Sequence, residues 1–284
     1  MSTDITPAVD YLGKAVNCAT CPYRDLQQQR RCELQRACIQ DRYAKRIDRF
    51  FAWNRELANT SLQHPYFEVR AVAAKYAHVF RLPRLLDDPD DTVRWSAAQR
   101  LPKRYLAKLR NDPSREVRIR VAARLEGPDL IPMMSDEDYY VRQTVAKRVA
   151  LYLLPFMIHD SEAEVRRVVA SRIGEEWLVP LMRDPAASVR IEVVQRLRPP
   201  QLSWFKHDAD WRVRYEIAGR VEQHYLSDLR NDDDPLVRER VEQRLLEVAS
   251  ADPNQQRRLN IPLHALSNYN QKHWEHAVLR LTWG

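Results

Sequence analysis

The chain has 284 residues, with 46 lysines and arginines against 39 aspartates and glutamates and a formal net charge of +7. It contains only 5 glycines and neither a GxGxxG nor a GxxxxGK motif, which argues against a glycine-rich phosphate-binding loop. The modest basic excess is compatible with an acidic protein or a nucleic acid as partner and establishes neither.

The N-terminal residues 1–17 contain neither the basic segment nor the apolar segment of a signal peptide. No apolar run approaches the roughly 18 residues that a membrane span needs. We therefore expect a cytoplasmic protein, in which thiols stay reduced and structural disulfides are rare.

All four cysteines lie in the stretch CATCPYRDLQQQRRCELQRAC: Cys18, Cys21, Cys32 and Cys38. Their spacing, C-x2-C-x10-C-x5-C, predicts a metal site, because four thiolates are the usual ligands of a [4Fe–4S] cluster and equally of a structural zinc ion. The first two thiols can approach one centre from a tight turn. The last two lie on a polar stretch that we expect to be helical, so they must converge through a bend or a helix end. The single CxxC slightly favours iron–sulfur over zinc, and disulfides are the least expected.

Four arginines lie within or beside this loop: Arg24, Arg30, Arg31 and Arg36. One hypothesis is that they donate hydrogen bonds or charge to an anionic cluster and raise its reduction potential. The alternative is a solvated basic face. If all four cysteines are ligands, no thiol is left for catalysis.

After the cysteines, residues 39–61 predict a helix with apolar residues Ile47, Phe50, Phe51 and Leu57, which joins the cysteine module to the rest of the chain.

A dipeptide, Val-Arg, then recurs eight times at intervals of 24 residues, from Val69-Arg70 to Val237-Arg238. Seven copies carry an aspartate five residues before the valine, and seven carry an arginine seven residues after it; His64 and Tyr76 stand there in the first copy. A leucine follows thirteen residues after the valine, from Leu82 to Leu226. Self-similarity at this period predicts a solenoid.

The first half of each repeat predicts an α-helix of about three turns, because Val93, Ala97 and Leu101 share one helical face. We expect Asp88 to be the N-cap of this helix and Pro89 its first residue. The second half is short and often contains proline, which fits a 3₁₀ turn or an irregular segment with its leucine buried. The repeats are too short for HEAT units and lack the strand of leucine-rich repeats.

Stacking places the recurring charges in rows. We expect each aspartate to cap its own helix and to pair with an arginine of the same or the next repeat. Fifteen arginines face seven aspartates in these rows, so the surplus could leave a basic groove for an acidic protein or a phosphate backbone. The tryptophans Trp95, Trp177, Trp204 and Trp211 stand at different phases, which favours local packing over a base-stacking platform.

The 24-residue period with its Val-Arg and leucine anchors, preceded by four clustered cysteines, resembles the leucine-rich repeat variant (LRV) iron–sulfur proteins. The resemblance implies alternating α- and 3₁₀-helices in a right-handed superhelix. It also implies a [4Fe–4S] module at the N-terminal end with Cys18, Cys21, Cys32 and Cys38 as ligands, and it hints at a nitrogen-fixation context.

We therefore expect an all-α chain with a cysteine module over residues 1–40, a linker helix over 41–61, eight LRV repeats over 62–247 and a C-terminal cap over 248–284. No acid–base pair, nucleophile or phosphate loop indicates an enzyme. The expected function is a non-enzymatic binding scaffold, with a protein favoured over DNA as partner, whose cluster makes binding redox-responsive or caps the array. The alternatives are an electron-transfer protein that docks a redox partner and, more weakly, a nucleic-acid binder with an arginine-rich groove.

Overall fold

The computed structural model describes residues 7–251 of the chain. It divides into two compact units, unit 1 over residues 1–150 and unit 2 over residues 151–284. Within the described residues the only β-structure is two isolated bridges, Val9 with Ala15 and Glu33 with Ala37, so the all-α prediction is confirmed. In the same part of the chain no helix has both the length and the apolarity that crossing a bilayer requires.

Unit 1 begins with short elements around the cysteines and a longer helix, α2, that leads into the repeats. These elements are η1 (Cys18–Thr20), α1 (Arg24–Gln28), α2 (Ala44–Trp53), η2 (Arg55–Ala58) and η3 (Ser61–Gln63). The helix predicted for this segment is present but shorter than expected: α2 holds Ile47, Phe50 and Phe51, whose side chains are fully buried, whereas Leu57 lies in η2.

Each repeat opens with an α-helix, as the period predicts. In unit 1 these helices are α3 (Phe67–Tyr76), α4 (Asp91–Arg100), α6 (Arg115–Ala122) and α7 (Tyr139–Ala146). In unit 2 they are α8 (Ala163–Arg172), α9 (Ala187–Arg196), α11 (Trp211–Ala218) and α13 (Pro235–Ala251). The predicted cap over 248–284 lies outside the described residues from 252 onward.

The second half of each repeat is mainly 3₁₀, also as expected, but three of these halves contain a single α-helical turn, which precedes the 3₁₀ segment in two of them and follows it in the third. The short α-turns are α5 (Lys103–Leu106), α10 (Pro199–Leu202) and α12 (Leu226–Leu229). The 3₁₀ segments are η4 (Val79–Asp87), η5 (Ala107–Leu109), η6 (Gly127–Ser135), η7 (Leu151–Met157), η8 (Glu175–Trp177), η9 (Val179–Arg183), η10 (Ser203–Phe205) and η11 (Gln223–Tyr225).

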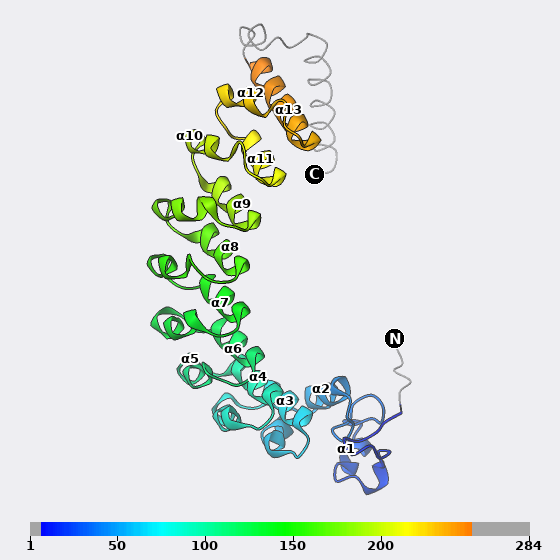
Figure 1. Ribbon diagram of the computed structural model, residues 1–284. Helices are drawn as coiled ribbons and strands as arrows, with labels where there is room; N and C mark the ends of the chain where they lie inside the picture. Colours follow the sequence, from blue (N-terminus) through cyan, green and yellow to red (C-terminus); the bar gives the residue numbers. More distant parts are fainter. Residues whose placement is uncertain (1–6, 252–284) are drawn as a thin grey trace. The chain divides into compact units, whose positions relative to one another are not determined.

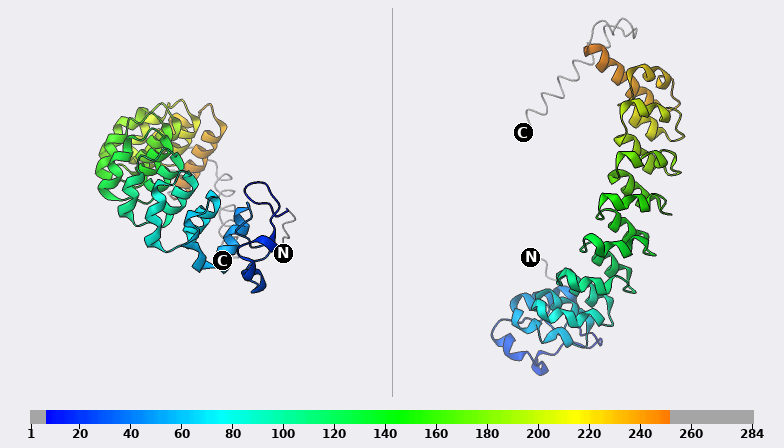
Figure 2. Two further views of the ribbon diagram at one scale, coloured as in Figure 1. Left: turned by 90° about the horizontal axis from the view of Figure 1, so that it is seen from below. Right: turned by 90° about the vertical axis from the view of Figure 1, so that its left-hand side faces the viewer.

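Within each unit the repeats stack in chain order (Figure 1): α3 contacts α4, α4 contacts α6 and α6 contacts α7, while α8, α9, α11 and α13 follow one another in unit 2. The α-helices occupy one edge of each stack and the 3₁₀ segments the other. The right-hand view of Figure 2 turns the edge with the 3₁₀ segments toward the viewer.

The core of each stack consists of the periodic apolar positions. Every valine of the Val-Arg series, from Val69 to Val237, is fully buried, and so is every leucine of the series from Leu82 to Leu226. One valine from the helix and one leucine from the 3₁₀ half therefore fill each layer, and no repeat could bury both without its neighbours.

The predicted helix start is wrong by two residues. Helix α4 begins at Asp91 with Asp90 as its N-cap, whose carboxylate accepts the N–H of Thr92 at 2.9 Å. Asp88 instead ends η4 and accepts the N–H of Asp90 at 3.0 Å, in a turn that leads into the helix. The periodic aspartate is thus not the cap of its own helix, because its carboxylate binds an arginine.

That arginine belongs to the Val-Arg pair of the preceding repeat. Its Nε and Nη2 donate to the two carboxylate oxygens of an aspartate 18 residues later, at 2.6 to 3.1 Å. The pairs are Arg70–Asp88, Arg94–Asp112 and Arg118–Asp136 in unit 1, and Arg166–Asp184, Arg190–Asp208 and Arg214–Asp232 in unit 2. This row is the Arg–Asp ladder. An aspartate–arginine pair between neighbouring repeats was expected, but the arginine comes from the preceding repeat and not from the same or the next one.

The remaining nitrogen of each ladder arginine binds the repeat to which the arginine belongs. Nη1 of Arg94 donates to the carbonyl oxygens of Asp88 at 2.8 Å and Pro89 at 3.2 Å. Both ends of the guanidinium are therefore occupied, one by its own repeat and one by the next, so each planar fork joins two layers.

Most arginines of the second row, seven residues after the valine, bind backbone carbonyls and not aspartates. Arg100 donates to the carbonyls of Ala74 and Ala77, both at 2.7 Å, and Arg196 donates to that of Ala170 at 2.6 Å. These carbonyls lie at the C-terminal end of the preceding helix, where unpaired acceptors and the helix dipole favour a cation. Most arginines of this row thus have backbone partners, and Arg244 pairs with Glu247 instead. The two rows therefore offer little support for the basic groove that their excess over aspartate suggested.

We expect Arg94→Ala to lower the free energy of unfolding by about 3 to 5 kcal/mol, because Asp112, whose side chain is 2% exposed, would lose its counter-ion. The matched control is Arg115→Ala, which removes an arginine that is half exposed and 3.0 Å from Asp138 and should cost less than about 1 kcal/mol. Urea unfolding followed by circular dichroism measures both. Equal losses for the two variants would contradict a structural role for the ladder.

Candidate metal centre

The four cysteines lie in unit 1, and all four are free thiols. Cys32 and Cys38 are buried, with 8% and 3% of their surface exposed, while Cys18 and Cys21 are partly exposed. A site formed by these sulfurs would therefore be closed on one side by protein and open toward solvent on the other.

Cys18 and Cys21 are presented by one tight turn, as their spacing predicts. The carboxamide oxygen of Asn17 accepts the N–H of Ala19 at 2.9 Å and starts η1, and the N–H of Cys21 donates to the carbonyl of Cys18 at 3.4 Å. The N–H of Tyr23 then points at the sulfur of Cys21, 3.5 Å away. A backbone donor on this sulfur stabilises its thiolate.

Helix α1 carries the chain from this turn to Cys32 and ends with a Schellman motif. Arg30 adopts the left-handed conformation with φ 57°, and its N–H donates to the carbonyl of Gln27 at 3.0 Å. The N–H of Arg31 donates to the carbonyl of Leu26 at 2.8 Å, which closes the motif. The chain therefore reverses just before Cys32.

The stretch from Cys32 to Cys38 is not helical, contrary to the prediction. Glu33 and Ala37 exchange backbone hydrogen bonds of 3.0 and 2.8 Å, and Gln35 between them has φ 62°. This tight reversal brings the two cysteines into contact although six positions separate them. It replaces the bend or helix end that the spacing required.

The cysteine thiols shift each other's pKa values. A hydrogen bond with Cys38 raises the pKa of Cys32, and burial and the thiols of Cys21 and Cys18 raise it further. The same hydrogen bond lowers the pKa of Cys38 to about 7, helped by the backbone N–H groups of Gln40 and Asp41. Burial raises the pKa of Cys21, with smaller contributions from Cys38 and Cys18. Cys21 and Cys32 thus each lie within electrostatic reach of Cys18 and Cys38.

Helix α2 holds the far end of the module through residues that the sequence analysis missed. The carbonyl of Arg46 accepts the N–H of Cys38 at 3.1 Å, and the Arg46 guanidinium binds Asp41 at 2.8 Å in a fully buried ion pair. Asn54 donates to the carbonyls of Arg31 and Phe50, both at 2.8 Å. The sequence did contain one indication that Arg46 is buried and paired: it stands 24 residues before Arg70 and is thus in phase with the ladder arginines.

The four arginines near the ligand loop do not all face the thiols. Arg31 pairs with Glu56, and Arg36 pairs with Glu33 at 2.9 Å and lies over the ring of Trp53. Arg24 and Arg30 are exposed. This arrangement favours the solvated basic face over direct donation from these side chains to the sulfurs.

The donor set fits a thiolate-bound iron–sulfur group. All four thiols are free, backbone N–H groups donate to the sulfurs of Cys21 and Cys38, and the two most buried thiols, Cys32 and Cys38, affect each other's pKa directly. Within residues 7–251 no set of three or more histidine, cysteine and acidic side chains has the arrangement for holding a metal ion.

The reversal around Gln35 generates a prediction. Gln35→Val should weaken binding of phenylarsine oxide, which bridges neighbouring thiols, by roughly fivefold, because a β-branched residue opposes positive φ and separates Cys32 from Cys38. Gln35→Gly is the matched control and should bind at least as well as the wild-type chain. Titration under anaerobic reducing conditions measures both; indistinguishable affinities for the valine and glycine variants would contradict the role of this turn.

Comparison with known proteins gives this region an identity. Residues 8–60 match the family model described as "LRV protein FeS4 cluster". A protein of Rhodobacter capsulatus, described as "Uncharacterized 27.7 kDa protein in nifB 3'region", is 53% identical over 94 residues, which are 33% of this chain and 38% of that relative. The match thus spans well under half of the relative's length.

The solenoid is also matched by a solved structure, described as "A leucine-rich repeat variant with a novel repetitive protein structural motif". It is 38% identical with a TM-score of 0.77, and the alignment covers 81% of this chain and 99% of that one. The chain therefore belongs to the leucine-rich repeat variant family, with an iron–sulfur cluster domain of that family at its N-terminal end.

Proposed function

We propose that the chain is a non-enzymatic, protein-binding scaffold that carries a [4Fe–4S] cluster on Cys18, Cys21, Cys32 and Cys38. The observation that carries the proposal is that the thiol of Cys32 interacts with those of Cys38, Cys21 and Cys18 at the start of a helical repeat stack. Repeat stacks offer extended surfaces for macromolecules, and nothing in the described part of this stack forms an acid–base pair or an activated nucleophile.

The chain's own residues account for how such a cluster would be held. Cys18 and Cys21 would bind from the η1 turn, and Cys32 and Cys38 from the two sides of the reversal at Gln35. The backbone N–H groups of Tyr23, Gln40 and Asp41 would donate to ligand sulfurs. A bound cluster would supply a one-electron couple, which would make binding redox-responsive. A structural zinc ion is the alternative occupant.

The partner that this proposal favours is a protein of nitrogen fixation. The support is the description of the Rhodobacter capsulatus relative, which refers to the nifB 3′ region. The two periodic arginine rows offer little support for a nucleic acid, since they bind aspartates and helix-end carbonyls. The cytoplasmic location stays a prediction.

A second function, electron transfer to a docked redox protein, is favoured by one observation. Cys18 and Cys21 are partly exposed, so the cluster would lie close to solvent on that side. A reversible midpoint potential in the physiological range would support this function, and a cluster that dithionite cannot reduce would exclude it.

Metal analysis tests the cluster. Anaerobically purified protein should contain about four irons and four acid-labile sulfides per chain, with a broad visible band that dithionite bleaches. Serine in place of Cys32 or Cys38 should remove most of this iron, whereas Glu33→Ala, next to Cys32 and exposed, should retain it. Zinc in place of iron would overturn the proposal, because the cysteines would then form a structural clip.

Affinity capture tests the scaffold role. The immobilised iron-loaded chain should retain a defined nitrogen-fixation protein from an anaerobic lysate, and the purified pair should then bind with similar affinity in isolation. Because surface contacts carry this binding, it should weaken only modestly as salt increases. Binding to nucleic acid would instead fall steeply with salt, and that result would replace the protein partner.

A further inference from the structure

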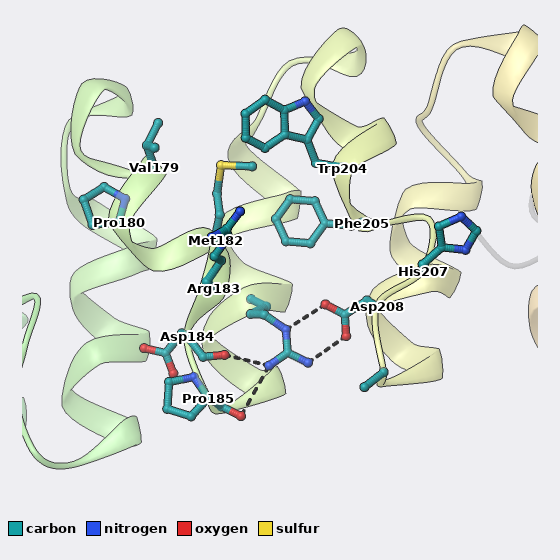
Figure 3. A pocket seen from close by; sticks show the side chains of 12 residues that line it. Val179, Pro180, Met182, Arg183, Asp184, Pro185, Trp204, Phe205, His207 and Asp208 are labelled. Carbon is teal, nitrogen blue, oxygen red and sulfur yellow. Dashed lines mark hydrogen bonds and ion pairs between the residues drawn. The ribbon is translucent and has the colours of Figure 1, made fainter.

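Unit 2 contains a hollow on its 3₁₀ edge, between η9 and η10, with a volume of about 780 Å³. Figure 3 shows Val179 and Pro180 on one side, Trp204 and Phe205 on the other, and Met182 between them. Met182 and Phe205 are buried, so the floor of the hollow is apolar. Two successive repeats supply its two walls.

Large apolar side chains in the walls of the hollow are exposed to water. Trp204 is 73% exposed and Val179 is 56% exposed, so of the core or edge packing expected for Trp204 only a place at the edge remains. An exposed tryptophan beside an apolar hollow is costly in water and is the kind of side chain that dominates protein–protein binding.

The acidic groups beside the hollow are already neutralised. Both carboxylate oxygens of Asp208 accept from Arg190, at 2.6 and 2.7 Å, and those of Asp184 accept from Arg166, at 2.7 and 2.9 Å. The third nitrogen of Arg190 is bound to the carbonyls of Asp184 and Pro185, as the dashed lines in Figure 3 mark. The ladder thus leaves neither a free carboxylate nor a free guanidinium here.

The charge left for a ligand is positive. Arg183 and His207 line the hollow and are exposed, and among the described residues no carboxylate pairs with Arg183. An apolar floor with a cation at its rim is complementary to an apolar side chain next to a carboxylate.

The apolar surface continues along the 3₁₀ segment of the preceding repeat in unit 2. In η7, Tyr152 is 75% exposed and Phe156 is 80% exposed. Phe156 stands 24 and 48 residues before Pro180 and Trp204, hence at the same phase of the repeat. A ligand that uses this edge must therefore be extended, which favours a peptide segment over a small molecule.

We propose that this hollow binds an extended segment of a partner protein, which places an aromatic or long aliphatic side chain over Met182 and Phe205 and a neighbouring carboxylate on Arg183. The proposal rests on the protein-binding role proposed above and names the surface and the chemistry of the partner. Trp204 would cover the inserted side chain.

The test uses the full iron-loaded chain and a short fluorescein-labelled peptide with a tryptophan between two aspartates, followed by fluorescence anisotropy. Trp204→Ala should weaken binding about tenfold, because it removes the largest exposed wall of the hollow. Arg183→Ala should weaken it about threefold and reduce its dependence on salt. A peptide with lysines in place of the aspartates should bind more weakly than the acidic one.

Phe80→Ala is the matched control, since Phe80 is 75% exposed on a 3₁₀ segment of unit 1 and does not line the hollow. It should leave the affinity unchanged, and circular dichroism checks the fold of each variant. Binding weaker than about 0.1 mM, equal binding of the lysine peptide, or an equal effect of Phe80→Ala would overturn the proposal. So would a Trp204-dependent dimer in sedimentation equilibrium that excludes the peptide, because a second copy would then occupy the hollow.

The iron content of the same preparations separates this proposal from the proposed function. If the chain retains its iron and still captures a protein partner but does not bind the peptide, only the assignment of the hollow is wrong. If no partner is captured either, the scaffold role itself is wrong.

Discussion

The bidentate contact between an arginine of one repeat and an aspartate of the next is the constraint on which this solenoid depends. Burying such a pair is expensive unless every donor and acceptor is matched, and here the guanidinium binds a carboxylate ahead of it and two carbonyls behind it. That match requires a separation of 18 residues between Arg94 and Asp112, and the same separation recurs along the chain. An inserted residue would move the carboxylate off the fork, which explains why the 24-residue period is kept without insertions.

The iron–sulfur module is attached to the stack through a modified copy of the same position. Arg46 is in phase with the ladder arginines, but the residue 18 positions later is His64, whose Nδ1 accepts the N–H of Tyr66 at 3.1 Å. Arg46 binds Asp41 instead, and its carbonyl receives the N–H of Cys38. A buried charge that joins two repeats elsewhere therefore joins the cysteine loop to the first helix that leads into the stack.

Periodic features could be predicted from the sequence, and features that depend on a single backbone conformation could not. The buried positions of Val93 and Leu106 followed from spacing, because eight copies of one pattern must bury the same face. The helix start was misplaced because Asp88 satisfies the rule for an N-cap while its carboxylate serves the ladder. The proximity of Cys32 and Cys38 depends on the positive φ of Gln35, and a glutamine in the sequence does not indicate this conformation. The gathering of four thiols could be predicted, but its local geometry could not.

Since the ladder and the helix-end contacts occupy most of the periodic arginines, the proposed binding of a partner would depend on positions where the repeats differ. The position fifteen residues after the Val-Arg valine illustrates this. It is Arg84, Lys108 and Pro132 in unit 1 and Phe156, Pro180, Trp204 and Asp228 in unit 2. The fold tolerates basic, acidic and aromatic residues there because side chains such as Arg84, Lys108, Phe156 and Trp204 are exposed. Selection for a partner can therefore act on the 3₁₀ edge without disturbing the contacts that set the period.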